Sequence, residues 1–329
     1  MPPSDDGSAR RRVWSAFPPA AETALRDGLA PTDLQTLLLD VARSRAAAVT
    51  PARLLRRWRE DRFVRPAASD PRALAAIEAR LWTLLPERFA GVDLSPVAPL
   101  GTVSALCPLD QNRMLSTVRG SELVSDPTNA LAIEAASRRR EQSRRSPPAP
   151  GGRVDLAASH RVVRGQRFTG RNEFAHFKLF ALVSSARDRG SGLVEAEMIV
   201  DHLRFYAAAI AAVVPTAKAE LVVSTFERTA VDERLDDLLP ELDRFAPAAV
   251  VRRDRERTHG RGYYTSHALR IDLRDAGGAT ANLGDGGLTD WTARLLGDAK
   301  ERCLTSCISV ERLAAVPAAK LDNPPLRRP

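Results

Sequence analysis

The sequence predicts an α+β fold in which helices flank a largely antiparallel sheet and a helical region precedes it. Between residues 30 and 86, apolar residues recur at helical spacing. From about residue 89, short β-rich runs alternate with helical segments, and their order mixes hairpins with crossovers. The chain has 329 residues, of which 44% are hydrophobic, so it can fill the core of one large domain and a smaller one.

Three helix starts are predicted in the N-terminal region, because a capping residue precedes each apolar face. They are Thr32 with Gln35, Thr50 before Pro51, and Asp70 before Pro71. We assign residues 1–86 to this helical region, residues 87–315 to the main domain and residues 316–329 to a flexible tail.

The main domain is expected to contain strands at RVVRG, FALVSS, ELVVSTF, AAVVRRD and YYTSHALRIDL. Long helices are predicted near residues 193–213 and 231–245, and another opens at Asp126. The glycine-rich DAGGATANLGDGG is expected to turn into a helix around Trp291. Prolines and glycines make residues 142–152 an exposed connector.

Composition narrows the class of protein. A formal charge of +8 and a pI near 10.1 permit contact with the phosphates of a nucleotide or an RNA, although coding bias toward arginine explains much of the charge. No apolar run is long enough to span a membrane and no signal peptide is indicated, so we expect a cytoplasmic protein without membrane contact. Cys107, Cys303 and Cys307 lack metal-ligand spacing and are expected to be structural thiols, with no metal site.

Arginines are concentrated in one predicted hairpin, HRVVRGQRFTGRNEFAHF, at residues 160–177. Guanidinium groups match phosphate oxygens bidentately and keep their charge, so this hairpin would suit a polyphosphate. A solvated basic hairpin is the alternative interpretation.

Three shorter features add to this one. YYT at residues 263–265 and GDGGLTDW at residues 284–291 each have an ordinary interpretation as packing or turn residues. In ISVERL, Arg312 would stand at a strand-to-helix junction, where backbone amides favour anions, but Glu311-Arg312 is also an ordinary surface pair.

The order of these segments resembles a class II aminoacyl-tRNA synthetase catalytic domain, closest to histidyl-tRNA synthetase, over roughly residues 86–315. RGQRFTGRNEF resembles the RPQ, GR and REF segments that follow the motif 2 arginine of that family. EAEMI, RGYYT, GGLTD and ISVERL resemble its DAEVI, RGLDYYTG, GGRYD and motif 3 GLERL, in the same order.

The resemblance implies a role for each matching residue. Arg161 would hold the α-phosphate of ATP and Arg312 the γ-phosphate, with Mg²⁺ as the accompanying ion. Asp126 and Thr128 would bind the α-amino group of an amino acid, although Asp126-Pro127 equally suits an ordinary helix cap. The remaining residues are Tyr263, Tyr264 and His176 in the amino-acid pocket, and Arg171 and Glu173 near the nucleotide.

Several positions depart from the family pattern. Val163 replaces the motif 2 acid, and His259 stands at the position of the catalytic arginine, with Arg261 two residues later. Phe180 replaces the glutamate that reads the imidazole in that family, and Leu288 replaces the arginine of GGRYD. Recognition of histidine itself is therefore not expected.

Two classes of function follow. The first is an enzyme that uses ATP to activate an amino acid as its adenylate, for transfer to a tRNA, a carrier protein or a small molecule. We expect a homodimer, because SPVAPLG resembles the dimer-forming motif 1, and no anticodon-binding domain after Leu313. The second is a non-catalytic paralogue, similar to the regulatory subunit of ATP phosphoribosyltransferase, or an RNA-binding protein.

Overall fold

The structure is a computed structural model, and the chain in it forms two compact units. The first contains residues 1–61 and 116–121, and the second residues 62–115 and 122–329. The predicted boundary at residue 86 stays a prediction. The residues described are 7–144, 152–166, 175–245, 249–275 and 277–316, so the predicted tail at 317–329 and most of the predicted connector lie outside them.

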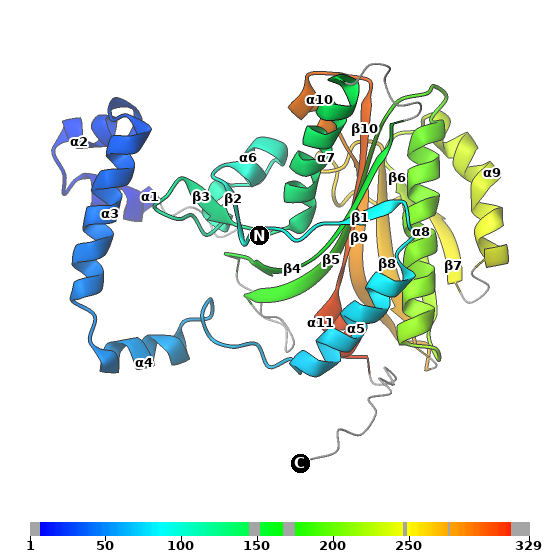
Figure 1. Cartoon of the computed structure of the whole chain (residues 1–329), viewed down its shortest axis with the longest axis horizontal. Helices are drawn as coiled ribbons and strands as arrows, with labels where there is room; N and C mark the ends of the chain where they lie inside the picture. Colours follow the sequence, from blue (N-terminus) through cyan, green and yellow to red (C-terminus); the bar gives the residue numbers. More distant parts are fainter. Residues whose placement is uncertain (1–6, 145–151, 167–174, 246–248, 276, 317–329) are drawn as a thin grey trace, which may run out of the picture. The chain divides into compact units, whose positions relative to one another are not determined.

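The first unit is helical (Figure 1). Thr50 caps its last helix as predicted, since its hydroxyl accepts from the backbone N–H of Arg53 at 3.3 Å. The prediction for Thr32 was wrong, because the helix begins one residue earlier and Ala30 occupies the capping position. Its helical segments are α1 (Gly7–Trp14), α2 (Pro19–Thr23), η1 (Ala24–Gly28), α3 (Pro31–Ala47) and α4 (Pro51–Glu60).

The second unit is built on an eight-stranded sheet of order β1-β4-β5-β10-β9-β8-β6-β7, and β2 and β3 form a separate pair. Among the described residues of the eight-stranded sheet, the two edge pairs, β1 with β4 and β6 with β7, are parallel and the other five pairs are antiparallel. The predicted largely antiparallel sheet is therefore confirmed. Its strands are β1 (Phe89–Gly91), β2 (Val97–Pro99), β3 (Ser121–Leu123), β4 (Val154–Val163), β5 (His176–Arg187), β6 (Lys218–Thr225), β7 (Ala249–Asp254), β8 (His267–Arg274), β9 (Thr280–Thr289) and β10 (Glu301–Ser309).

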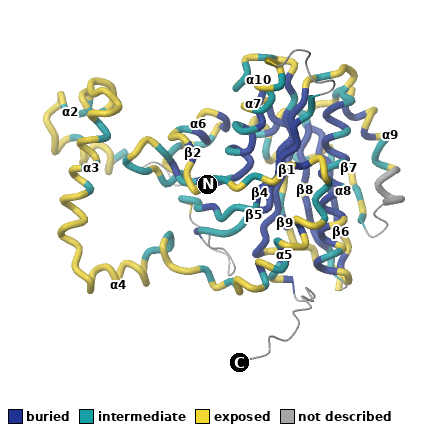
Figure 2. The backbone as a smooth tube through the Cα atoms, viewed as in Figure 1, coloured by how far each residue is buried: buried dark blue, intermediate teal, exposed yellow. Residues whose placement is uncertain are grey.

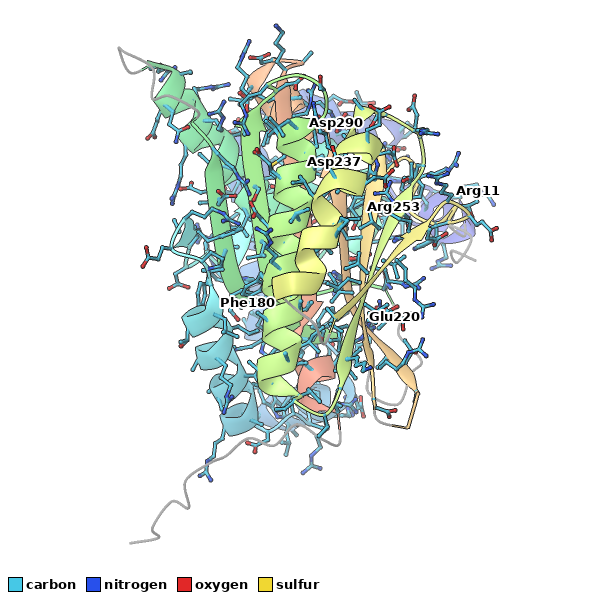
Figure 3. The ribbon with its side chains drawn as sticks, turned by 90° about the vertical axis from the view of Figure 1, so that its right-hand side faces the viewer. Arg11, Phe180, Glu220, Asp237, Arg253 and Asp290 are labelled. Carbon is cyan, nitrogen blue, oxygen red and sulfur yellow. The ribbon has the colours of Figure 1, made fainter. Side chains whose placement is uncertain are left out.

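Helices cover both faces of this sheet, and the strands between them are its most buried part (Figure 2). One face packs against α5, α8 and α11, and α9 lies beside α8 (Figure 3). The opposite face packs against α7 and α10. The helices are α5 (Pro71–Leu84), α6 (Thr102–Leu106), η2 (Gln111–Arg113), α7 (Pro127–Arg144), α8 (Leu193–Val213), α9 (Ala230–Phe245), α10 (Trp291–Leu296) and α11 (Val310–Ala314).

Strand alternation divides the core between the two faces. On β5, Phe180 and Leu182 point toward α8, whereas Leu179 and Ala181 point toward α7. The predicted helix at Asp70 is confirmed, and its Leu74, Ile77 and Leu81 are buried at 3%, 0% and 0% exposure. No helix among the described residues is long and apolar enough to span a bilayer.

Two predictions about the C-terminal half were wrong. The strand predicted from Tyr263 begins only at His267, because Gly260 and Gly262 adopt positive φ angles and place the tyrosines in a turn. The segment GDGG, predicted as a turn, lies inside β9, which pairs with β8 and β10 along that stretch.

Candidate functional site

Asp126 and Thr128 lie at the start of α7, where the sequence allows either a ligand contact or a helix cap. Oδ1 of Asp126 accepts from the backbone N–H of Thr128 at 3.0 Å and from its hydroxyl at 2.7 Å. These are capping contacts. The second oxygen, Oδ2, lies 3.5 Å from Nη2 of Arg164. Capping uses Oδ1 of the carboxylate, and Oδ2, with only the long contact to Arg164, can accept a further hydrogen bond from a ligand.

Arg164 follows the end of β4, and the sequence marks it only as one of several arginines in the hairpin. Its Nε donates to the carbonyl of Ser125 at 3.0 Å, and its guanidinium lies over the ring of Phe177 at 5.1 Å from the ring centroid. These contacts hold the guanidinium beside the start of α7. The side chain remains 32% exposed, so a ligand can reach it.

Tyr263 and Tyr264 meet edge to face, with ring centroids 4.9 Å apart. Tyr264 packs against the backbone of Gly287, where an added Cβ would lie 2.5 Å from ring carbon Cδ1. Tyr263 packs against Trp291 at 5.6 Å and lies beside the buried thiol of Cys107. Burial raises the pKa of both tyrosines well above its ordinary value, so both hydroxyls keep their protons at neutral pH.

Asp285 is the residue that sequence reasoning missed, although its segment GDGG was singled out. It faces Cys307 across the β9–β10 pair and lies two residues before Gly287, on the same side of the strand. Solvent reaches the carboxylate, yet the surrounding protein removes enough water to raise its pKa, and the charge of Asp126 raises it further. The segment GDGG has the composition of a turn, so the sequence alone does not indicate that it forms a strand on which Asp285 lies near a tyrosine.

We call Asp126, Arg164, Tyr263, Tyr264 and Asp285 the face cluster. Its members come from four separate segments of the chain, and they are close enough for their charges to shift one another's pKa values. The structure thus brings together five residues: the acid and the two tyrosines predicted for the amino-acid site, an arginine that was not predicted there, and a second acid.

Arg161 lies outside the face cluster, near the end of β4. Its Nη2 lies 3.3 Å from Oε1 of Glu311, the residue before Arg312, and its Nη1 lies 3.2 Å from Nδ1 of His176. Nε2 of His176 donates to the carbonyl of Arg65 at 2.8 Å, so Nδ1 is the acceptor for Arg161. His176, predicted in the amino-acid pocket, therefore contacts the predicted phosphate ligand Arg161.

Arg312 stands at the predicted strand-to-helix junction between β10 and α11. Its Nη1 contacts the carbonyl oxygen and Oδ1 of Asn282 at 3.3 and 3.1 Å, and its side chain is exposed. Arg312 and Glu311 line a cavity of about 520 Å³, which Arg161 does not line. Arg161 contacts Glu311, the residue that precedes Arg312 in the chain, and the guanidinium of each arginine is engaged with a protein partner.

Arg171 and Glu173, predicted near the nucleotide, lie outside the described residues. At the catalytic-arginine position, the carbonyl of His259 accepts from Nε of Arg257 at 2.8 Å. Arg261, the possible substitute, donates instead to the carbonyl of Phe226 at 3.3 Å. Neither Arg257 nor Arg261 is shown in contact with a face-cluster side chain.

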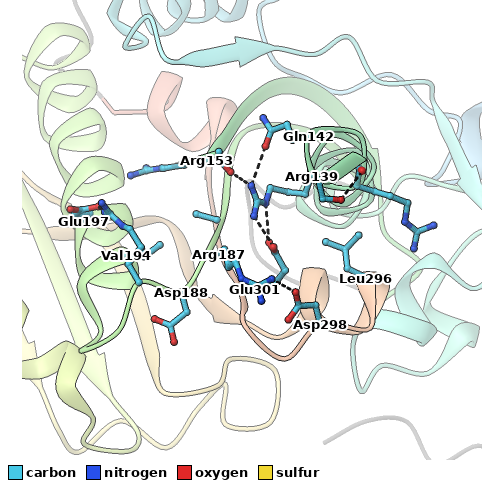
Figure 4. Close-up of a pocket in the computed structure, with 15 residues that line it drawn as sticks. Arg139, Gln142, Arg153, Arg187, Asp188, Val194, Glu197, Leu296, Asp298 and Glu301 are labelled. Carbon is cyan, nitrogen blue, oxygen red and sulfur yellow. Dashed lines mark hydrogen bonds and ion pairs between the residues drawn. The ribbon is translucent and has the colours of Figure 1, made fainter. Parts of the chain in front are cut away.

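A second cavity of about 520 Å³ lies where the end of α7 meets the start of β10 (Figure 4). Arg139 forms two hydrogen bonds with Glu301, at 2.7 and 3.0 Å, and also contacts Gln142. The side chains of Arg139 and Glu301 are only 11% and 6% exposed. This pair joins α7 to the sheet, and the neighbouring Arg187 pairs with Asp298 at the surface.

Comparison with known proteins places this geometry in context. No protein-family model matches the chain, and no curated protein matches it. Among solved structures, it is similar to apo histidyl-tRNA synthetase of Staphylococcus aureus, with a TM-score of 0.51, 16% identity, and coverage of 74% of this chain and 64% of that one. The chain thus spans less than two thirds of that enzyme.

Two further structures are similar at comparable levels. An ATP phosphoribosyltransferase regulatory subunit/histidyl-tRNA synthetase from Bacillus halodurans has a TM-score of 0.53 at 10% identity, covering 74% of this chain and 78% of that one. A structure described as the RNA binding domain of threonyl-tRNA synthetase from Cryptosporidium parvum has a TM-score of 0.50 at 13% identity, covering 73% of this chain and 64% of that one. The resemblance inferred from sequence order is therefore confirmed at the level of architecture, and the chain has the fold of a class II aminoacyl-tRNA synthetase catalytic domain.

Proposed function

We propose that this chain binds an amino acid at the face cluster and activates it with ATP as an aminoacyl-adenylate. The observation that carries the proposal is the convergence of Asp126, Arg164 and Tyr264 on one face of a class II synthetase-like sheet. Oδ2 of Asp126 would accept from the α-ammonium group. The hydroxyl of Thr128 donates its proton to Oδ1 of Asp126, so the oxygen of this hydroxyl would accept a second hydrogen bond from the α-ammonium group. The tyrosines would exclude water from the side chain of the ligand.

ATP is the co-substrate that the two remaining arginines suit. A carboxylate oxygen of the amino acid would attack the α-phosphorus, the bond to pyrophosphate would break, and Arg161 would neutralise the charge that develops. To do so, Arg161 must exchange its contact with Glu311 for a contact with the α-phosphate, and Arg312 must exchange its contact with Asn282 for a contact with the γ-phosphate. Mg²⁺ would accompany ATP, as the resemblance implies, and phosphate oxygens and water would supply most of its ligands, since the described residues contain no group of three acids, histidines or cysteines placed to hold a metal ion.

Pyrophosphate exchange into ATP tests activation directly. With each standard amino acid in turn, exchange that requires one amino acid and is lost in Arg312→Ala supports the proposal. Asp290→Asn is the matched control, because Asp290 is 54% exposed and pairs only weakly with Arg294, at 3.8 Å. Exchange that persists in Arg312→Ala would contradict the assignment of the γ-phosphate to this arginine.

A non-catalytic paralogue is the second candidate. The replacement of the motif 2 acid by Val163 and of the catalytic arginine by His259 favours it, as does the similarity to a protein described as a regulatory subunit. In that case the folded protein would bind an amino acid, with heat detectable by calorimetry, but catalyse no exchange. Binding without exchange would therefore select this candidate.

We also propose a homodimer built on the segment that resembles motif 1. Val97 in β2 and Leu100 after it are 38% and 51% exposed, which leaves apolar surface for a second copy. Light scattering after size exclusion should give twice the chain mass, and Leu100→Glu should give a monomer. A monomeric wild-type protein at micromolar concentration would reject the dimer.

A further inference from the structure

Asp285 carries an inference about the ligand, which rests on the proposed amino-acid site. Within the described residues, no arginine, lysine or histidine forms an ion pair with its carboxylate, although several cations lie nearby. Three arginines in this region are held by other groups, and among them Arg257 donates to the carbonyls of His259 and Leu269 at 2.8 and 3.3 Å. Arg164 contacts Ser125 and Asp126, and Arg270, opposite Asp285 on β8, binds Asp272 at 2.7 Å.

The surroundings of Asp285 make its charge costly. The ring of Tyr264 and the buried thiol of Cys307 adjoin it, and Gly286 and Gly287 contribute no polar side chain. Removing water from a carboxylate without supplying a cation disfavours the charged form. A carboxylate in this position is therefore set to gain from a cation supplied by a ligand.

A single ammonium group does not satisfy the face cluster. Asp126 already has Arg164 at 3.5 Å and suits the α-ammonium group, whereas Asp285 has no described partner, and the two carboxylates repel each other. Arg164 uses Nε and Nη2 in its contacts, so Nη1 can face the α-carboxylate of a ligand. The arrangement provides for two cations and one anion.

We propose that the ligand is a diamino acid, an α-amino acid whose side chain carries a second amino group, and that Asp285 binds this second group. The aliphatic part of such a side chain would lie against Tyr264, and its ammonium would pair with the carboxylate of Asp285, for which the described residues supply no ion-pair partner. Asp285 would then determine specificity, whereas Asp126 would bind the group common to all amino acids.

Calorimetric titration of the full chain with L-lysine, L-ornithine and L-norleucine tests this proposal. Norleucine has the length of the lysine side chain without its amino group. We expect lysine or ornithine to bind about 10- to 100-fold more tightly than norleucine, as for a charged hydrogen bond. In Asp285→Asn this preference should disappear while norleucine binding is retained, and in Asp290→Asn it should remain.

The possible outcomes distinguish the role of Asp285 and the diamino-acid ligand from the existence of the amino-acid site itself. Equal binding of lysine and norleucine by the wild type would overturn the diamino acid while leaving the amino-acid site intact. A lysine preference that survives in Asp285→Asn would overturn the role of Asp285. No binding of any standard amino acid by a protein whose circular dichroism shows it folded would overturn the proposed site itself. Circular dichroism also establishes that Asp285→Asn is folded.

Discussion

A chain of hydrogen bonds around His202 predicts how stability should depend on pH. His202, in α8, is fully buried, with Nε2 at 2.9 Å from Oγ of Ser184 and Nδ1 at 2.7 Å from Oγ of Ser306. The hydroxyl of Ser184 donates to Asp155, so the oxygen of Ser184 accepts from Nε2–H of His202. Nδ1 of His202 then accepts from the hydroxyl of Ser306, and the oxygen of Ser306 accepts from the hydroxyl of Tyr206 at 2.8 Å. Every donor in this chain is matched only when the imidazole is neutral.

The size of this change in the free energy of unfolding follows from the proton that His202 binds on acidification in the unfolded chain but not in the folded one. Burial, with Arg153 and Arg88 nearby, holds the pKa of folded His202 well below its ordinary value of 6.5. Because the folded pKa lies below the unfolded one, this stability is present above pH 6.5 and is lost as the pH falls. Between pH 7.5 and 5.0, His202 alone should lower the free energy of unfolding by about 2 kcal/mol.

Urea unfolding of the wild type and His202→Gln at these two pH values measures this contribution. The wild type should lose about 2 kcal/mol more than the variant on acidification, because glutamine has no proton to gain in the unfolded state. His160 and His267 also have lowered pKa values, so both proteins should lose stability, and only the difference reports on His202. Equal losses would refute the argument. If His202→Gln does not fold, an imidazole resonance of His202 that titrates above pH 5.5 in the folded wild type would refute it as well.

Three further predictions concern other parts of the sheet. Arg139→Met should lower the free energy of unfolding by about 3–5 kcal/mol in urea, because it leaves a buried carboxylate unpaired, whereas Arg187→Met at an exposed pair should cost less than about 1 kcal/mol. Gly287→Ala should cost about 1–3 kcal/mol by overpacking against Tyr264 and should weaken amino-acid binding; stability equal to the wild type would show that the ring can move away. Asp285→Asn should raise the melting temperature slightly at pH 7, because the raised pKa of Asp285 means that ionisation of this carboxyl destabilises the folded protein as the pH rises. The gain should vanish near pH 3, where the carboxyl is protonated in both the folded and the unfolded chain. A variant that melts at a lower temperature than the wild type at pH 7 would show that the charge of Asp285 has a partner.

Local signals in the sequence identified many element starts. Asp70 and Asp126 accept from the backbone N–H two residues later, so their helices begin where the cap predicts. Short apolar runs rich in β-branched residues located β5 and β6 for the same reason, since these patterns act over a few neighbouring residues.

Signals that depend on distant contacts were harder to interpret. GDGG is a turn in most local contexts, but here its glycines allow β10 and the ring of Tyr264 to approach β9 closely. The face cluster was hard to predict for the same reason, because Asp285 becomes a candidate ligand contact only when β9 brings it beside Tyr264 from another segment of the chain. Arg161 shows the converse, since its motif position is apparent in the sequence but its contact with Glu311 is not.

The place of β10 in the sheet has a consequence for biosynthesis. β10 lies between β5 and β9, although it is made after both of them. Before residues 301–309 have been made, any sheet that forms can contain only the two partial sets β1-β4-β5 and β9-β8-β6-β7, each with an open inner edge. Open strand edges attract other strands, so this interval is when the chain is most exposed to aggregation or chaperone capture. The sheet becomes continuous only when β10 is available to join its two halves.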